Sequence, residues 1–364
     1  MPVLLKIFFL NLNTHLFRDI IFIFLVLLVS LFIFIVCYTI NKRVSEAKKK
    51  VWLETIADLI NAAIFSTDKS PICGELSEKL IALLKIQGFR NYMINALSDA
   101  KKNLSGSSAM NIKKLYEELS LDRDSFQKLK NNSWHIKAKG IQELAVMQQA
   151  KYVKHIFKLT THANELVRNE AQCCLLNIYG FPGLRFLDVA EYPVSQWQHI
   201  QLLNKLNDVL PNNFDPIKKW LRSSNESVVV FALKLSAFYN CYAVYDDVIK
   251  CMENSCMQVK LTALAYLKKI GQEGTSKLIL VSYYFQNKII KLAVLNALID
   301  LGTVADVPFL LRELNDKDDN VKAAAAKALS YLHPSGTTFL QTQQCANQNP
   351  WKAIFLQLKN ERAA

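Results

Sequence analysis

The chain has 364 residues, of which 51% are hydrophobic, so it can bury a large core. Its 10 glycines and 9 prolines are few enough to suit an all-helical protein. Its eight cysteines show neither a pairing pattern nor zinc-ligand spacing, which argues against a disulfide framework and favours reduced thiols in the cytoplasm. The formal net charge of +13 raises nucleic acid and anionic membranes as partners. Lysines on solvated helix faces explain this charge more simply, so nucleic acid is the less favoured partner.

The N-terminal stretch, residues 1–19, is apolar but is interrupted by Lys6 and by asparagines. It is too short to cross a bilayer, and we expect it to lie in the membrane interface. The sequence leaves open whether it inserts more deeply.

The segment from Ile20 to Ile40 has 21 residues and no charge. At ~1.5 Å per residue such a helix spans about 30 Å, the thickness of one hydrocarbon core. A cleaved signal peptide is the alternative, but its apolar region would be too long and no small-x-small cleavage site follows. Residues 20–40 are therefore predicted to form a transmembrane helix.

Basic residues follow this segment immediately, whereas only Lys6 and Arg18 precede it. The positive-inside rule then predicts a single-pass protein of the inner (plasma) membrane whose C-terminal domain is cytoplasmic. The five basic residues are predicted to lie at the membrane surface, where anionic lipid headgroups are candidate ligands. They are Lys42, Arg43, Lys48, Lys49 and Lys50.

Two regions separate the membrane helix from the rest of the chain. Residues 41–66 are predicted to form a basic juxtamembrane helix that ends at a break over Ser66–Pro71. Residues 67–132 contain several short helical segments that do not share the pattern described next. They are predicted to form a helical capping region, because the first unit of a stack would otherwise expose its apolar face to water.

A short pattern recurs through residues 133–335. Residues at offsets 0, 4, 7, 8 and 11 are apolar or small, which is one stripe of an amphipathic helix. In the last three copies, which begin at Val259, Ile290 and Val321, the spacing is 31 residues. Earlier copies begin at Ile136, Val167 and Val228, and a poor copy at Ser195 is displaced by about three residues.

Each of these helices follows another apolar segment and a polar turn, as in Val304–Leu314 followed by Asn315–Asn320. A lone helix pair cannot bury both of its apolar faces, so neighbouring pairs must stack. The pattern therefore predicts an all-α fold in which a right-handed α-solenoid of helix pairs, with a period of about 31 residues, follows the transmembrane helix. Residues 336–364 are predicted to form a C-terminal capping helix and tail.

The pattern resembles the HEAT repeat family, in which a turn rich in Asp and Asn precedes Val-Arg/Lys-x-x-Ala-x-x-Ala-Leu. Val321-Lys322, Ala325 and Ala328-Leu329 follow this form, although the period is the shorter one of HEAT-like repeats. Segments such as Phe89–Tyr92, Lys113–Leu119 and Ser133–Ile136 are also similar to membrane-anchored bacterial HEAT proteins of the Bacteroidetes type. That resemblance implies a role in a cell-envelope or polysaccharide-related system and no catalytic residue.

The sequence offers no set of residues for catalysis, for a cofactor or for a metal. It lacks a phosphate-binding glycine loop and a His-Glu-x-x-His motif. His155 and His162 are seven residues apart without an evident third ligand. The acids at Asp316–Asp319 lack the glycine and the distal glutamate of a calcium loop. We therefore predict that the protein is not an enzyme.

A scaffold or adaptor that binds a partner protein through the solenoid is the function that the sequence favours. One alternative is a HEAT-like enzyme of the lyase or DNA-glycosylase type, which would need acids and aromatics in one concavity. The other is a nucleic-acid-binding solenoid, whose binding would depend steeply on salt.

Two places in the solenoid are candidates for partner contacts. Phe231, Lys234, Phe238 and Lys269 occupy offsets that packing does not use, and aromatic anchors with a polar rim are typical of interfaces. Both phenylalanines could instead pack against the irregular third repeat. That repeat, over residues 182–211, is interrupted by prolines and is either a turn-rich irregularity, a hinge or a notch for a partner.

Overall fold

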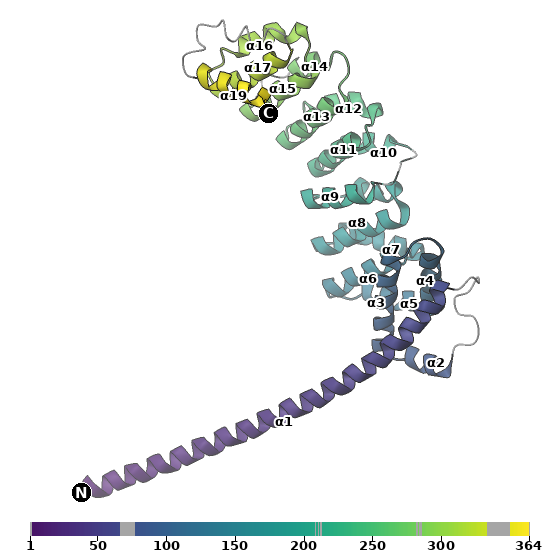
Figure 1. Cartoon of the computed structure of the whole chain (residues 1–364), viewed down its shortest axis with the longest axis vertical. Coiled ribbons are helices and arrows are strands. Elements are labelled where there is room, and N and C mark those ends of the chain that lie inside the picture. Colours follow the sequence, from purple (N-terminus) through teal and green to yellow (C-terminus); the bar gives the residue numbers. More distant parts are fainter. Residues whose placement is uncertain are drawn as a thin grey trace. The chain divides into compact units, whose positions relative to one another are not determined.

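Helices account for the regular structure of the chain, and no strand occurs in the residues described below (Figure 1). The computed structural model describes residues 2–65, 77–207, 209, 211, 213–281, 283, 286–332 and 350–363. The predicted break over Ser66–Pro71 and the predicted boundary near residue 335 lie outside the described residues. Residues 1–127 and 128–364 form two compact units.

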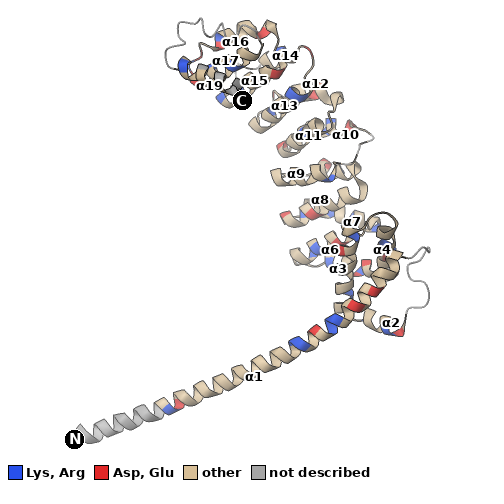
Figure 2. Ribbon diagram, viewed as in Figure 1, with Lys and Arg blue, Asp and Glu red and all other residues tan. Residues whose placement is uncertain are grey.

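A single helix, α1 (Pro2–Phe65), runs through the first three predicted segments. From Phe17 onward it is long and apolar enough to cross a membrane, and the side chains of its apolar stretch are exposed. Figure 2 shows this stretch as a tan ribbon followed by basic residues. Lys42, Arg43, Lys48 and Lys50 are exposed, whereas Lys49 is half-buried with its Nζ 5.8 Å from the centre of the Tyr92 ring.

The C-terminal end of α1 belongs to the core of the first unit. Ile56 and Ala63 are buried, and the Trp52 ring meets the Phe89 ring edge-on at 5.9 Å. The Asn111 side chain donates a hydrogen bond to the Ala63 carbonyl oxygen at 3.1 Å. The apolar helix is therefore continuous with a packed helical unit. Besides α1, that unit contains α2 (Glu78–Leu84), α3 (Gln87–Asn103), α4 (Gly106–Glu118) and most of α5 (Leu121–Leu129).

In the second unit one set of longer helices packs side by side in chain order (Figure 1). These long helices are α6 (Trp134–Val146), α8 (Glu165–Tyr179), α9 (Gln196–Lys205), α11 (Glu226–Phe238), α13 (Met257–Ile270), α15 (Lys288–Leu301) and α17 (Asp319–Leu332). The last of them contacts the C-terminal helix α19 (Trp351–Ala363).

Shorter elements precede the long helices from α8 onward and form a second row beside them. They are η1 (Ala150–Tyr152), α7 (Val153–Phe157) and η2 (Lys158–Thr161); η3 (Phe181–Val189); α10 (Asp215–Leu221); η4 (Tyr242–Val244) and α12 (Tyr245–Cys251); α14 (Thr275–Val281); and η6 (Val304–Asp306) and α16 (Val307–Glu313).

The residues at offset 0 form the centre of this core. Val167, Val228, Val259, Ile290 and Val321 are all buried. Small residues at offset 4, such as Ala263 and Ala325, are fully buried and let the next helix approach closely. These positions explain why the helices pack along one stripe.

Glycines after α13 and α15 make room for the next long helix. A Cβ atom on Gly302 would lie 2.5 Å from a methyl carbon of Leu332, and a Cβ atom on Gly271 would clash with Leu301. Both glycines have negative φ angles, so the requirement is for space and not for a left-handed backbone.

The third long helix, α9, begins 31 residues after α8, so the predicted displacement of about three residues is wrong; its sequence departs from the pattern because a polar residue occupies the apolar position. Ser195 caps the helix in a capping box with Gln198. Gln198 lies where α8 has Val167, and it is buried. Its amide donates to the Asn169 side chain and, at 3.4 Å, to Gln172 Oε1 on α8. Hydrogen bonds between helices thus replace the apolar contact made elsewhere.

Candidate functional site: two hollows beside a proline-broken helix

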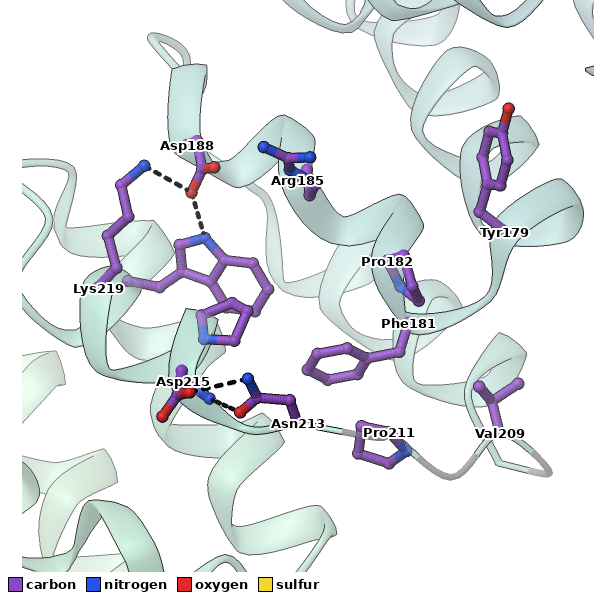
Figure 3. Close-up of a pocket in the computed structure, with 12 residues that line it drawn as sticks. Tyr179, Phe181, Pro182, Arg185, Asp188, Val209, Pro211, Asn213, Asp215 and Lys219 are labelled. Atoms are coloured by element: carbon purple, nitrogen blue, oxygen red, sulfur yellow. Dashed lines mark hydrogen bonds and ion pairs between the residues drawn. The ribbon is translucent and has the colours of Figure 1, made fainter.

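A concavity of the second unit lies between η3 and α10, within the row of shorter elements (Figure 3). This larger hollow has a volume of about 660 Å³, within the range of sites that bind ligands or anchor side chains. Its lining residues are Tyr179, Phe181, Pro182, Arg185, Asp188, Val209, Pro211, Asn213, Asp215, Pro216, Lys219 and Trp220.

The segment Gly180-Phe181-Pro182-Gly183 creates this shape. Gly180 ends α8 at a φ of 63°, a conformation that favours glycine. Pro182 sits at the start of η3, where no backbone donor is needed. Gly183 packs directly on α8, since a Cβ atom there would lie 2.5 Å from the Leu175 carbonyl oxygen. A tight helical segment therefore replaces an ordinary first helix and leaves space beside it.

Aromatic rings form the floor of the larger hollow. Phe181 and Trp220 are buried, and their ring centres are 6.1 Å apart. The Phe181 ring also meets Phe214 at 6.5 Å and Tyr239 at 6.0 Å, both edge-on. The Tyr239 hydroxyl donates to the Val209 carbonyl oxygen at 2.8 Å. This cluster gives the hollow a fixed apolar base.

Two of the four charged groups at the rim form an ion pair. Asp188 Oδ1 accepts a hydrogen bond from the Trp220 indole N–H at 2.8 Å and lies 3.1 Å from Lys219 Nζ. This carboxylate therefore ties the end of η3 to α10, as the dashed lines in Figure 3 show.

The other two rim charges differ in their surroundings. Asp215 Oδ2 accepts from the Asn213 side chain at 2.8 Å, and Asp215 lies in the first turn of α10, where a negative charge is favoured. Arg185 is exposed and forms no ion pair with any residue that the structure describes. Arg185 and Asp215 are thus the rim charges without an ion pair among the described residues, and of the two only Arg185 also lines the smaller hollow described next.

A smaller hollow of about 540 Å³ lies on the other side of η3, against α7 and α8. Val153, Phe157, Leu175, Gly183 and Val189 contribute to its lining. The two hollows share a ridge, which we define as Tyr179, Pro182, Arg185 and Asp188. Arg185 thus stands between two apolar depressions.

Chemically, this arrangement is suited to binding. Among the described residues, no group of three or more His, Cys, Asp and Glu side chains is placed to hold a metal ion. Burial raises the pKa of the Cys174 thiol to about 12 and that of Cys251 to about 11, so both stay protonated and are poor nucleophiles.

The prediction that Phe231 is exposed is wrong. Phe231 is fully buried, and its ring packs against His199 of α9 with the ring centres 5.1 Å apart. His199 of α9 covers this position, which agrees with the alternative that Phe231 packs against the third repeat. Phe231 is therefore a core residue and cannot form the centre of a binding surface.

The other three residues predicted to bind a partner make contacts within the stack of long helices. Lys234 and Phe238 are half-buried, with Lys234 Nζ 3.3 Å from His199 Nδ1 and the Phe238 ring against Tyr239. Lys269 is exposed, and its Nζ donates to the Ala237 carbonyl oxygen at 2.7 Å. These lysines hold α9, α11 and α13 together.

The basic residues at offset 1 also make structural contacts. Arg168 donates to the His162 and Ala163 carbonyl oxygens, each at 2.8 Å, and its guanidinium carbon lies 4.2 Å from the centre of the Tyr192 ring. Lys260 donates to Gln286 Oε1 at 2.8 Å. These two basic residues therefore contribute to the packing of the repeats.

Sequence reasoning singled out Pro182 and Pro211 but not the charged and aromatic residues around them. The available signal was the proline-interrupted segment itself together with Gly180 and Gly183. Nothing in a repeat frame indicates that Arg185, Asp188 and Trp220 converge, because they come from two segments with different local structure.

No family model matches this chain, and no curated protein matches it. A crystal structure of an engineered protein is similar over 85% of this chain and 98% of its own length, with 13% identity and a TM-score of 0.38. A likeness at that level carries no argument about fold or function.

Proposed function

We propose that this protein is a membrane-anchored cytoplasmic scaffold or adaptor that binds a partner protein through a right-handed solenoid of HEAT-like helix pairs. The regular spacing of the long helices supports the solenoid. The long helices begin at Trp134, Glu165, Gln196, Glu226, Met257, Lys288 and Asp319, a spacing of 30 or 31 residues, and neighbours in this series pack together. Stacked pairs of this kind offer extended binding surfaces.

The anchor is α1, which acts as a single-pass helix of the inner membrane with the second unit in the cytoplasm. The exposed basic residues just after its apolar stretch support this orientation. They also lie where they would meet anionic headgroups. The resemblance to membrane-anchored bacterial HEAT proteins favours a cell-envelope or polysaccharide-related process.

The observation that carries partner binding is the larger hollow. Partner hot spots are aromatic or apolar anchors that enter well-packed pockets surrounded by polar groups. The buried Phe181–Trp220 floor with Arg185, Asp188, Asp215 and Lys219 at its rim has this anatomy.

The test is co-purification of the full chain from its native membrane in mild detergent, followed by quantitative mass spectrometry. The variant Tyr179→Asp with Arg185→Glu alters exposed ridge residues only. Tyr242→Asp with Lys277→Glu is the matched control, since both positions are exposed and lie away from the hollows. We expect the first variant alone to lose at least one specific protein. Identical protein sets for wild type and both variants would overturn the proposal.

A further inference from the structure

The ridge between the two hollows constrains what a partner must present. Two apolar depressions of about 660 and 540 Å³ flank one short element, η3, and share the ridge residues. A single compact side chain can fill only one of them. An extended segment can place one side chain in each and cross the ridge between them.

The charges at the ridge select for an anion. On the ridge, Asp188 is already paired with Lys219 and accepts from the Trp220 indole N–H, whereas Asp215 lies outside the ridge and lines only the larger hollow. Arg185 is exposed and has no ion-pair partner among the described residues. Its planar guanidinium suits a carboxylate, which it can bind with two parallel hydrogen bonds.

We propose that the two hollows bind one extended segment of a partner protein that carries an acidic side chain between two large apolar side chains. The apolar side chains enter the hollows on either side of η3, and the carboxylate pairs with Arg185. This inference rests on the proposed function, namely that the chain binds a protein partner, and specifies the kind of segment that it binds.

The experiment uses the full chain in lipid nanodiscs and a phage-displayed library of random linear peptides as the probe. We expect the selected peptides to share an acidic residue flanked by two large apolar residues. A synthetic peptide of the selected sequence and its Glu→Gln or Asp→Asn counterpart are then compared by fluorescence anisotropy. Loss of a charge-assisted hydrogen bond predicts affinity weaker by about tenfold to a hundredfold.

Charge reversal gives the sharper comparison. Arg185→Glu should weaken the affinity for the acidic peptide by at least about tenfold and strengthen the affinity for its Lys-substituted counterpart. Lys277→Glu should change neither affinity. Selected peptides without an acidic residue, peptides that match this chain's own sequence, or affinities unaffected by Arg185→Glu would each overturn the inference. If co-purified proteins still depend on the ridge, the proposed function survives that failure. If they do not, both fail.

Discussion

At the scale of single residues, His199 shows how α9 packs against α11. His199 is 2% exposed, and its ring packs against Phe231. Its Nδ1 lies 3.3 Å from Lys234 Nζ, while its Nε2 has no hydrogen-bond partner among the described residues. Burial and the nearby Lys234 charge lower the pKa of His199 to about 4. The imidazole is therefore neutral in the folded protein under conditions where a free histidine begins to charge.

This geometry predicts a pH dependence of stability with a definite sign. Below the ordinary pKa of 6.5 the unfolded chain binds a proton at His199, whereas the folded chain does not until about pH 4. The contribution of His199 to the free energy of unfolding should therefore fall by about 2 kcal/mol between about pH 7 and about pH 5. Urea unfolding of the full chain in detergent at both pH values measures this change in the free energy of unfolding. The variant His199→Gln should show a smaller change between the two pH values. An equally large change in that variant would contradict this reasoning.

Gly302 offers a second residue-level prediction. Gly302→Ala should lower the free energy of unfolding by about 1–3 kcal/mol, because its Cβ would overlap the Leu332 side chain and the Leu298 carbonyl oxygen. Gly88→Ala is the matched substitution. A Cβ atom at Gly88 would make an ordinary contact of 3.4 Å with the Trp52 ring. The higher helix propensity of alanine should stabilise this variant by up to about 1 kcal/mol. Thermal unfolding followed by circular dichroism should show a lower melting temperature for Gly302→Ala and a higher one for Gly88→Ala. A Gly302→Ala variant as stable as the wild type would show that this helix junction accommodates the added methyl group.

At the scale of helices, sequence patterns indicate the regular elements well and the irregular ones poorly. α11, α13, α15 and α17 each begin two residues before the apolar residue at offset 0, so periodicity alone finds them. Periodicity does not find α9, because its position at offset 0 holds Gln198. This residue packs against α8 through hydrogen bonds and not through an apolar side chain. The hollows also escape the pattern, since they depend on how η3 packs against α8.

The junction between α1 and the first unit gives a prediction at this scale. A chain that begins at Val51 retains Trp52, Ile56 and Ala63, and should be soluble and folded without the apolar stretch. A chain that begins at residue 66 loses these contacts, exposes the Phe89 ring and leaves the Asn111 amide without its partner. Size-exclusion chromatography and circular dichroism compare the two. Equal solubility and equal melting of both chains would show that the end of α1 is dispensable for the first unit.

At the scale of the whole molecule, the chain combines an apolar helix with a body whose described cysteines are free thiols. Both features are compatible with the proposed membrane-anchored protein. The binding surface that we propose lies in the row of shorter elements, at the proline-interrupted repeat that was one of the two places the sequence offered, and not on the long helices around Phe231.

The orientation of the anchor predicts the behaviour of C-terminal fusions. Because the basic residues follow the apolar stretch, a fused green fluorescent protein should fluoresce and a fused alkaline phosphatase should be inactive. Replacing Lys42, Arg43, Lys48, Lys49 and Lys50 by glutamine should weaken this preference and raise phosphatase activity. An active phosphatase on the unaltered chain would place its C-terminal end outside the cytoplasm.

Site-specific photo-crosslinking in living cells tests partner binding at the ridge most directly. A photoreactive phenylalanine at Tyr179 reports on the ridge between the hollows, and the same group at Tyr242, which is 63% exposed, serves as the control. We predict a discrete adduct with one protein from Tyr179, absent from Tyr242 and lost when Arg185→Glu is added. The same adducts from both positions, or an adduct from Tyr179 that survives Arg185→Glu, would contradict the account.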